Sequence, residues 1–178
     1  MDFLRLLAAG RCGALDTFFS SLTYFGSEIA FMAAALLIFW CIDKRQGYYV
    51  FLVGALGTIC NQFLKLAFRI PRPWVLDPDF QIVEAARADA TGYSFPSGHT
   101  IASFEACTVL MLHDKRLGIP ATVLAILIAF SRLYLYVHYP TDVLVSLVLG
   151  ILFGFLGSYI VDQIYKKKVY NGKYSLKE

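Results

Sequence analysis

Hydrophobic residues in this chain are gathered into long continuous runs, unlike the alternating or one-sided patterns of a water-soluble domain. The clearest run, Gly47 to Phe68, carries a single charged residue, Lys65, near one of its ends. A run of this length can cross about 30 Å of hydrocarbon as a helix. Further runs of similar character follow the same pattern: Ile29 to Ile42, His99 to Leu112, Gly118 to Ser131 and Val143 to Ile164. The pattern therefore predicts an all-α, polytopic membrane bundle of about five transmembrane helices.

The first 25 residues do not fit this pattern. Arg11, Gly13 and Asp16 fall where a membrane-spanning helix would need its apolar centre. We therefore expect an amphipathic helix that lies along the membrane surface, with a sixth span as the alternative. A cleaved signal peptide is not expected, because the start is acidic and no small-residue cleavage site follows an apolar core.

Composition agrees with a membrane location. The 178 residues are 58% hydrophobic and 16% charged, whereas soluble domains are about 45 to 50% apolar. No repeat or shift in composition marks a second domain. We expect one membrane-embedded domain over residues 1–178, with an N-terminal segment (1–25), a transmembrane core (26–165) and a basic tail (166–178). The four scattered cysteines are expected to pack as small apolar residues and not to bind metal.

Lysine and arginine are shared unevenly between the two sides that alternating spans would create. Nine fall on one side and seven on the other, and four of those seven lie in or beside the polar clusters described below. Without these four, nine lysine and arginine residues lie on one side and three on the other. Because cytoplasmic loops are enriched in lysine and arginine, we expect the lysine-rich side and the C-terminus to be cytoplasmic.

Three polar clusters interrupt the apolar pattern, and each falls at a helix end that alternation places on the opposite, extracytoplasmic side. The clusters are Lys65 with Arg72, then Ser97 with Gly98 and His99, then Arg132 with His138 and Asp142. Because up-and-down threading brings these helix ends to one membrane face, the sequence predicts a single site there.

The first two clusters suit an anion. Lys65 provides a point charge and Arg72 a bidentate fork, although cations that snorkel at the end of a span are a common alternative. Gly98 removes a side chain that would block a ligand. The backbone amides at the start of its helix favour negative charge. An ordinary helix capped by serine would have the same sequence pattern and is the alternative.

The third cluster suits nucleophilic chemistry. The Asp142 carboxylate can hold one N–H of the His138 ring, which fixes the tautomer and leaves the other nitrogen to attack. The alternatives are a carboxylate that balances the helix dipole and a histidine at an aqueous interface.

The three clusters resemble the signature motifs of the type 2 phosphatidic acid phosphatase superfamily, in order and with unbroken spacing. The matching segments are Lys65-x6-Arg72-Pro73, Pro96-Ser97-Gly98-His99 and Ser131-Arg132-x5-His138-x3-Asp142. The resemblance covers residues 65–142 directly. It implies a metal-independent phosphatase or pyrophosphatase of the integral-membrane branch, with no cofactor, that works through a phosphohistidine.

The resemblance also implies a role for each residue. His138 attacks phosphorus, Asp142 orients the ring, and His99 protonates the leaving oxygen and later activates water. The phosphoryl oxygens are stabilised by Lys65, Arg72, Arg132, Ser97 and the amide of Gly98. Two more residues are candidates only: Arg69, on the helical face of Lys65, and Glu105, an ionisable residue within a span.

The implied substrate is a lipid phosphate or pyrophosphate. The first candidate is undecaprenyl pyrophosphate, with phosphatidylglycerol phosphate and phosphatidic acid next. A vanadate-dependent haloperoxidase and a non-enzymatic lipid transporter or scaffold are the alternatives. No nucleic-acid partner is expected, and the sequence does not indicate an oligomeric state.

Overall fold

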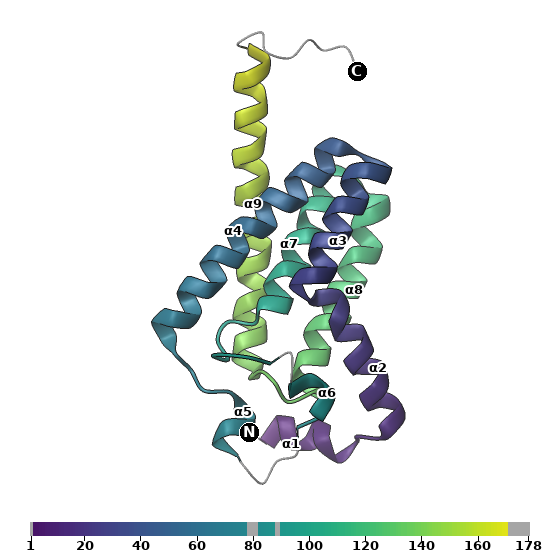
Figure 1. The fold of residues 1–178 in the computed structure, drawn as a ribbon, viewed down its shortest axis with the longest axis vertical. Helices are drawn as coiled ribbons and strands as arrows, with labels where there is room; N and C mark the ends of the chain where they lie inside the picture. The colour runs from purple at the N-terminus through teal and green to yellow at the C-terminus, as the bar shows by residue number, and fades with distance from the viewer. Residues whose placement is uncertain (1, 78–81, 88–89, 171–178) are drawn as a thin grey trace.

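The computed structural model describes residues 2–77, 82–87 and 90–170, and these form helices joined by loops. The longest helices are α4 (Lys44–Phe68), α8 (Lys115–Tyr134) and α9 (Pro140–Tyr170). Two shorter helices, α3 (Glu28–Leu37) and α7 (Gly98–His113), complete the bundle (Figure 1). The predicted all-α membrane bundle is therefore confirmed.

Each of the five predicted runs is helical, but their lengths differ. By length and composition, α4, α8 and α9 can each cross a membrane. The 16 residues of α7 rise only about 24 Å. A further span would require α2 (Gly13–Thr23) and η1 (Tyr24–Gly26) to join α3 and η2 (Ile38–Ile42) across a bend of 58°. The described residues thus hold three clear spans, or four with the bent pair.

Helix α7 is the centre of the bundle, and it packs against α4, α8 and α9. The approach of α9 is close at two glycines. A Cβ atom at Gly150 would lie 2.8 Å from the Ile101 carbonyl oxygen, and one at Gly154 would lie 2.6 Å from the Cβ of Thr108. Larger residues at these positions would push the two helices apart and loosen the core between them.

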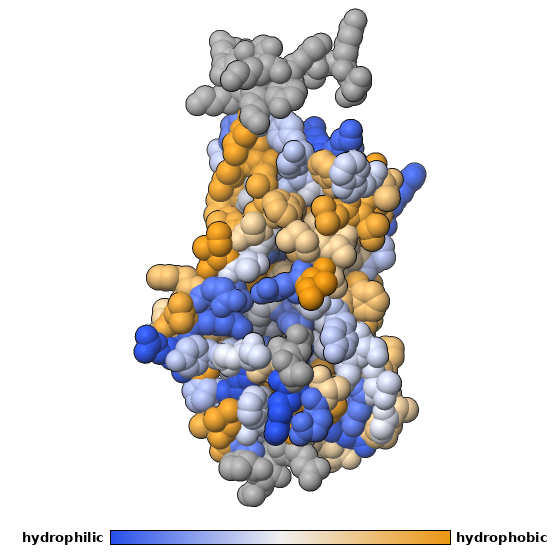
Figure 2. Space-filling model, in the orientation of Figure 1, coloured by the Kyte–Doolittle hydropathy of each residue, from blue (hydrophilic) through white to orange (hydrophobic). Residues whose placement is uncertain are grey.

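The helices alternate in direction, so the predicted polar ends meet at one end of the bundle. In Figure 1, α4 and α8 run downward and α7 and α9 run upward, which brings the end of α4 and the start of α7 to the lower half. The basic residues that begin α4 and α8 lie at the opposite end. Figure 2 shows the same division: apolar side chains dominate the upper half of this face below a small polar group, and polar side chains dominate the lower half.

The N-terminal segment caps the lower end. The expected single surface helix is instead two helices, α1 (Asp2–Ala9) and α2. Arg5 Nη2 lies 2.7 Å from Asp77 Oδ2, and Arg11 Nη2 donates to the carbonyl oxygen of Tyr134 at 2.5 Å. The one-turn helices α5 (Pro73–Leu76) and α6 (Glu84–Arg87) lie at the same end (Figure 1). The last residues of the predicted basic tail, 171–178, lie outside the described residues.

Candidate active site

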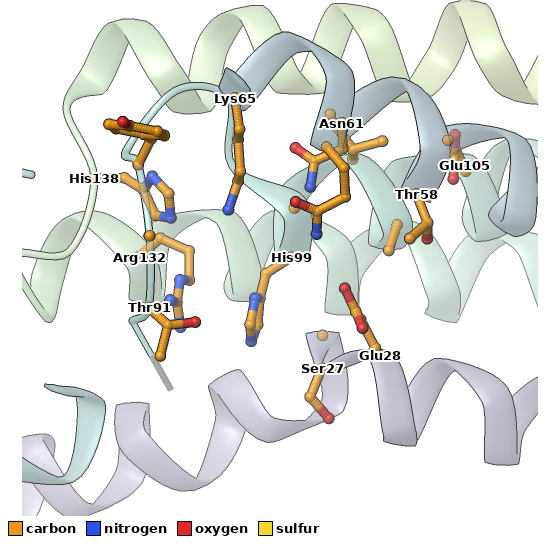
Figure 3. A pocket seen from close by; sticks show the side chains of 18 of the residues that line it. Ser27, Glu28, Thr58, Asn61, Lys65, Thr91, His99, Glu105, Arg132 and His138 are labelled. Carbon is orange, nitrogen blue, oxygen red and sulfur yellow. The ribbon is translucent and has the colours of Figure 1, made fainter. Parts of the chain in front are cut away.

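The polar helix ends surround one cavity of about 500 Å³ between α3, α4, α7 and the turn after α8. Six residues that the sequence predicted for the site line it: Lys65, Arg72, Gly98, His99, Arg132 and His138. Figure 3 shows Lys65, His99, Arg132 and His138 around the same space, although they come from different segments. The convergence predicted from the threading of the chain is therefore present.

His138 lies in a tight, fully buried turn between α8 and α9. Tyr136 in this turn has a φ of 63°, a left-handed conformation that is uncommon for a bulky residue. The amide of Val137 donates to the Arg132 carbonyl oxygen at 3.2 Å. The His138 side chain is 2% exposed and faces the cavity through Nε2, which is 3.4 Å from Nη1 of Arg72.

Asp142 lies behind the His138 ring. Its Oδ2 is 3.5 Å from His138 Nδ1, close enough for electrostatic contact but too long for a hydrogen bond. The same oxygen accepts hydrogen bonds from Ser94 Oγ at 2.5 Å and from the Tyr139 amide at 3.0 Å. An acceptor beside Nδ1 favours the tautomer with the proton on Nδ1, and a cationic donor beside Nε2 favours a lone pair there. Nε2 is thus the nitrogen that keeps a lone pair.

Arg72 is fixed in the wall of the cavity by backbone carbonyl groups. Its Nε donates to Gly92 at 3.0 Å, Nη1 to Val137 at 3.1 Å and Nη2 to Thr91 at 2.7 Å. These bonds join the loop before α7 to the turn that carries His138. A guanidinium held in this way loses little side-chain entropy when it binds an anion.

The other two cations come from the ends of long helices. Arg132 is 1% exposed, and its Nη1 donates to Thr23 Oγ1 at 2.6 Å, so the end of α2 positions it. Lys65 lies in the last full turn of α4, which ends at Phe68 because Arg69 adopts a left-handed conformation. The cavity thus has Lys65, Arg72 and Arg132 gathered around His138.

The electrostatic environment holds His138 neutral. Burial lowers the pKa of the imidazole well below its ordinary value of 6.5, and the positive charges of Arg72, Arg132 and Lys65 lower it further. A neutral ring is the form that can act as a nucleophile.

Two predicted site residues are placed differently from the expectation. Ser97 is fully buried and does not line the cavity: its amide donates to Ser146 Oγ at 2.7 Å, and its Oγ accepts from Thr100 Oγ1 at 2.9 Å. The prediction that its amide points to the anion is therefore wrong. Arg69 is exposed outside the cavity and donates from Nε to the Leu66 carbonyl oxygen, because the helix ends before it.

Glu105 does line the cavity, together with polar residues that the sequence reading missed. These are Ser27, Glu28, Thr58, Asn61, Gln62, Thr91 and Tyr93. Ser94, Ser146 and Thr23 were missed as supports for the site. Asn61 and Gln62 carried a signal in the sequence, because side-chain amides in an apolar run are unusual. Among the described residues, no group of three or more His, Cys, Asp or Glu side chains is placed to hold a metal ion.

Known proteins share both the sequence and the fold. Residues 46–166 match the PAP2 superfamily. The undecaprenyl-diphosphatase BcrC of Bacillus subtilis is 33% identical over 142 residues, which cover 76% of this chain and 72% of the relative.

Two crystal structures resemble the whole bundle. LpxE of Aquifex aeolicus has a TM-score of 0.77 at 29% identity, with 89% of this chain and 93% of the other covered. A PAP2-type phosphatidylglycerolphosphate phosphatase from Bacillus subtilis has a TM-score of 0.73 at 26% identity, with 90% and 83% covered.

Proposed function

The chain belongs to the PAP2 superfamily of lipid phosphatases, and we propose that it releases phosphate from a membrane lipid phosphate or pyrophosphate through a phosphohistidine at His138. One observation carries this proposal: a buried imidazole presents Nε2 to a cavity whose walls hold three cationic side chains. A phosphoryl group placed there would meet the nucleophile and the charges that stabilise its oxygens at the same time.

In the first step, Nε2 of His138 attacks phosphorus, and the bond between phosphorus and the leaving oxygen breaks. His99, which lines the cavity at the start of α7, donates a proton to that oxygen. Asp142 stabilises the positive charge that develops on the His138 ring, through Nδ1. The products are the dephosphorylated lipid and a phosphohistidine.

In the second step, His99 takes a proton from water, and the water oxygen attacks phosphorus. The bond to Nε2 breaks, which restores neutral His138 and releases inorganic phosphate. In both steps Lys65, Arg72, Arg132 and the amide of Gly98 stabilise the three equatorial oxygens. Ser97 acts one layer behind them, as a positioning residue that fixes the start of α7 through Ser146 and Thr100.

Among substrates, we place undecaprenyl pyrophosphate first, with phosphatidylglycerol phosphate and phosphatidic acid next. The names of the Bacillus relatives support the first two. We also propose that residues 1–178 act as a single domain whose site faces outward. The basic starts of α4 and α8 at the far end of the bundle favour a cytoplasmic position for that end.

A panel of lipid phosphates tests the proposal. Purified protein with EDTA present is expected to release phosphate from at least one of the three lipids, because the proposed chemistry uses only side chains of the chain. Phosphate release is measured as kcat/KM for each lipid. Movement of lipid between leaflets without phosphate release would support a transporter instead, and oxidation of bromide with added vanadate would support a haloperoxidase.

The pKa of His138 predicts a shifted pH profile. Because the folded protein lowers this pKa below 6.5, the reactive neutral ring persists as the pH falls through that value. The acid limb of kcat/KM that belongs to His138 is therefore expected below pH 6.5. Profiles on two lipids whose phosphates ionise at different pH values separate this limb from substrate ionisation. A His138 limb at or above pH 6.5 on both lipids would contradict the prediction.

A further inference from the structure

Beyond Lys65, the side chains that line the cavity are no longer cations but groups that can accept hydrogen bonds. Its walls there carry two carboxyl groups, Glu28 and Glu105, with the amides of Asn61 and Gln62 and the hydroxyl of Thr58. No lysine or arginine among the described residues lines this part of the cavity. Figure 3 shows Glu28 directed from the start of α3 toward α4, and Glu105 at the end farthest from His138.

Two of these side chains are buried with acceptor oxygens that no described residue satisfies. Glu105 is 1% exposed, and neither of its carboxyl oxygens has a hydrogen-bond partner; Asn61 is 4% exposed, and its Oδ1 has none. Such groups cost stability unless a donor reaches them. Both line the cavity, so a bound group can supply the donor.

Glycines make room for both side chains. A Cβ atom at Gly57 would collide with the Glu105 carboxyl group, and one at Gly98 would lie 2.9 Å from Nδ2 of Asn61. Asn61 therefore lies directly over the start of α7, where the phosphate binds in the proposed mechanism. This contact joins the accepting part of the cavity to the phosphate site.

We infer that the cavity holds a second subsite for a hydrogen-bond-donating group of the lipid head group, with Glu28 and Asn61 nearest the phosphate and Glu105 farther from it. An ammonium group suits it best, because the Glu28 carboxylate attracts positive charge and the acceptor oxygens of Asn61 and Glu105 can each take an N–H. A hydroxyl group suits it next. The inference rests on the proposed phosphatase function and extends its substrates to amino and hydroxy lipid phosphates.

The spacing of the lining residues along α4 determines how far from the phosphate the donor group of the lipid can lie. Lys65 and Asn61 are one helical turn apart, about 6 Å, and Gly57, beneath Glu105, is a further ~6 Å along the axis. Glu28 interacts electrostatically with Lys65, which places its charge beside the phosphate end. A donor on the carbon next to the phosphate-bearing carbon would therefore meet Glu28 and Asn61, and only a longer head group would reach Glu105.

A matched pair of lipids tests the subsite. Sphingosine 1-phosphate carries an ammonium group next to its phosphate-bearing carbon, and its N-acetyl derivative has the same chain without that charge. The wild-type protein is expected to favour the amine by about tenfold in kcat/KM, the effect of one charge-assisted hydrogen bond. A ratio near one would overturn the inference.

Variants then assign the preference to residues. Glu28→Gln removes the charge and Asn61→Leu removes the acceptor at similar volume, and each is expected to reduce the preference for the amine at least threefold, because hydrolysis of the amine loses more than hydrolysis of the N-acetyl lipid. Glu84→Gln, on the exposed helix α6, is the matched control and should keep the full preference. An equal loss on both lipids would indicate a structural role for Glu28 or Asn61 and would contradict the subsite.

Binding separates this inference from the proposed function. The His138→Ala protein, which lacks the proposed nucleophile, is expected to bind sphingosine 1-phosphate more tightly than the N-acetyl lipid by the same factor. If the wild-type protein binds both lipids with this preference but hydrolyses neither, the proposed function fails and the subsite stands. If it hydrolyses both and the His138→Ala protein binds them equally, only the subsite fails.

Discussion

Replacing His138 with alanine is expected to lower kcat for phosphate release by about 10⁴-fold or more, the range seen when a catalytic nucleophile is removed. The ring is the group that the structure places between Arg72 and Asp142, and no other side chain in the turn from Leu135 to Tyr139 offers a comparable nucleophile. Single-turnover assays with a ³²P-labelled lipid should show an acid-labile phosphoenzyme in the wild type and none in His138→Ala.

His113 provides the matched control, because it is a histidine at the other end of the bundle. Its ring packs on Tyr49, with the centroids 4.3 Å apart, and does not line the cavity. His113→Ala is expected to keep activity within about threefold, since it removes only a packing contact far from the site. A His138→Ala protein with near-normal turnover would contradict the phosphohistidine mechanism.

Replacing Asp142 with asparagine is expected to lower kcat by about 10³- to 10⁴-fold, although the side chain keeps its size. An amide at this position can donate a hydrogen bond to Nδ1 of His138, which would move the proton of the ring to Nε2. The nitrogen that faces the cavity would then have no lone pair for attack. Steady-state kinetics measures the loss, and the cooperative unfolding temperature checks that the fold is retained.

Ser94→Ala separates the positioning of the Asp142 carboxylate from its role as an acceptor for the His138 ring. It removes the 2.5 Å hydrogen bond to Oδ2 but leaves the carboxylate beside the ring. We expect a loss of about tenfold, because one hydrogen bond to a charged group is removed while the tautomer is kept. A loss as large as that of Asp142→Asn would show that the position of the carboxylate, and not its accepting character, controls the reaction.

The cationic end of the cavity could be predicted because its residues lie at the ends of apolar runs. Lys65 precedes two prolines, His99 follows a proline and a glycine, and His138 and Asp142 flank Pro140. Hydropathy locates the helices, and alternation then assigns each end to a side. The motif spacing supplied the rest, since Asp142 lies in the first turn of α9 and His138 lies just before that helix.

The supporting residues could not be predicted, because their partners are distant in the sequence. Ser94 is 48 residues from Asp142, and Thr23 is 109 residues from Arg132. Serine and threonine are common in loops and in membrane helices, so neither position stands out. The amide of Ser97 was assigned to the anion because a helix start usually leaves its amides free, and here a hydroxyl from α9 occupies it.

By itself, the sequence determined the class of protein and located the residues of the proposed phosphate site. Long apolar runs allow only membrane helices, and the residue types at their ends allow only a few reactions. The tertiary structure decided which helices are full spans, that Arg69 and Ser97 stay out of the cavity, and that an acid-lined space continues beyond Lys65. These three features depend on where the helices bend and how closely they pack. Side-chain volumes in three dimensions control bending and packing, and the hydropathy along the chain does not contain this information.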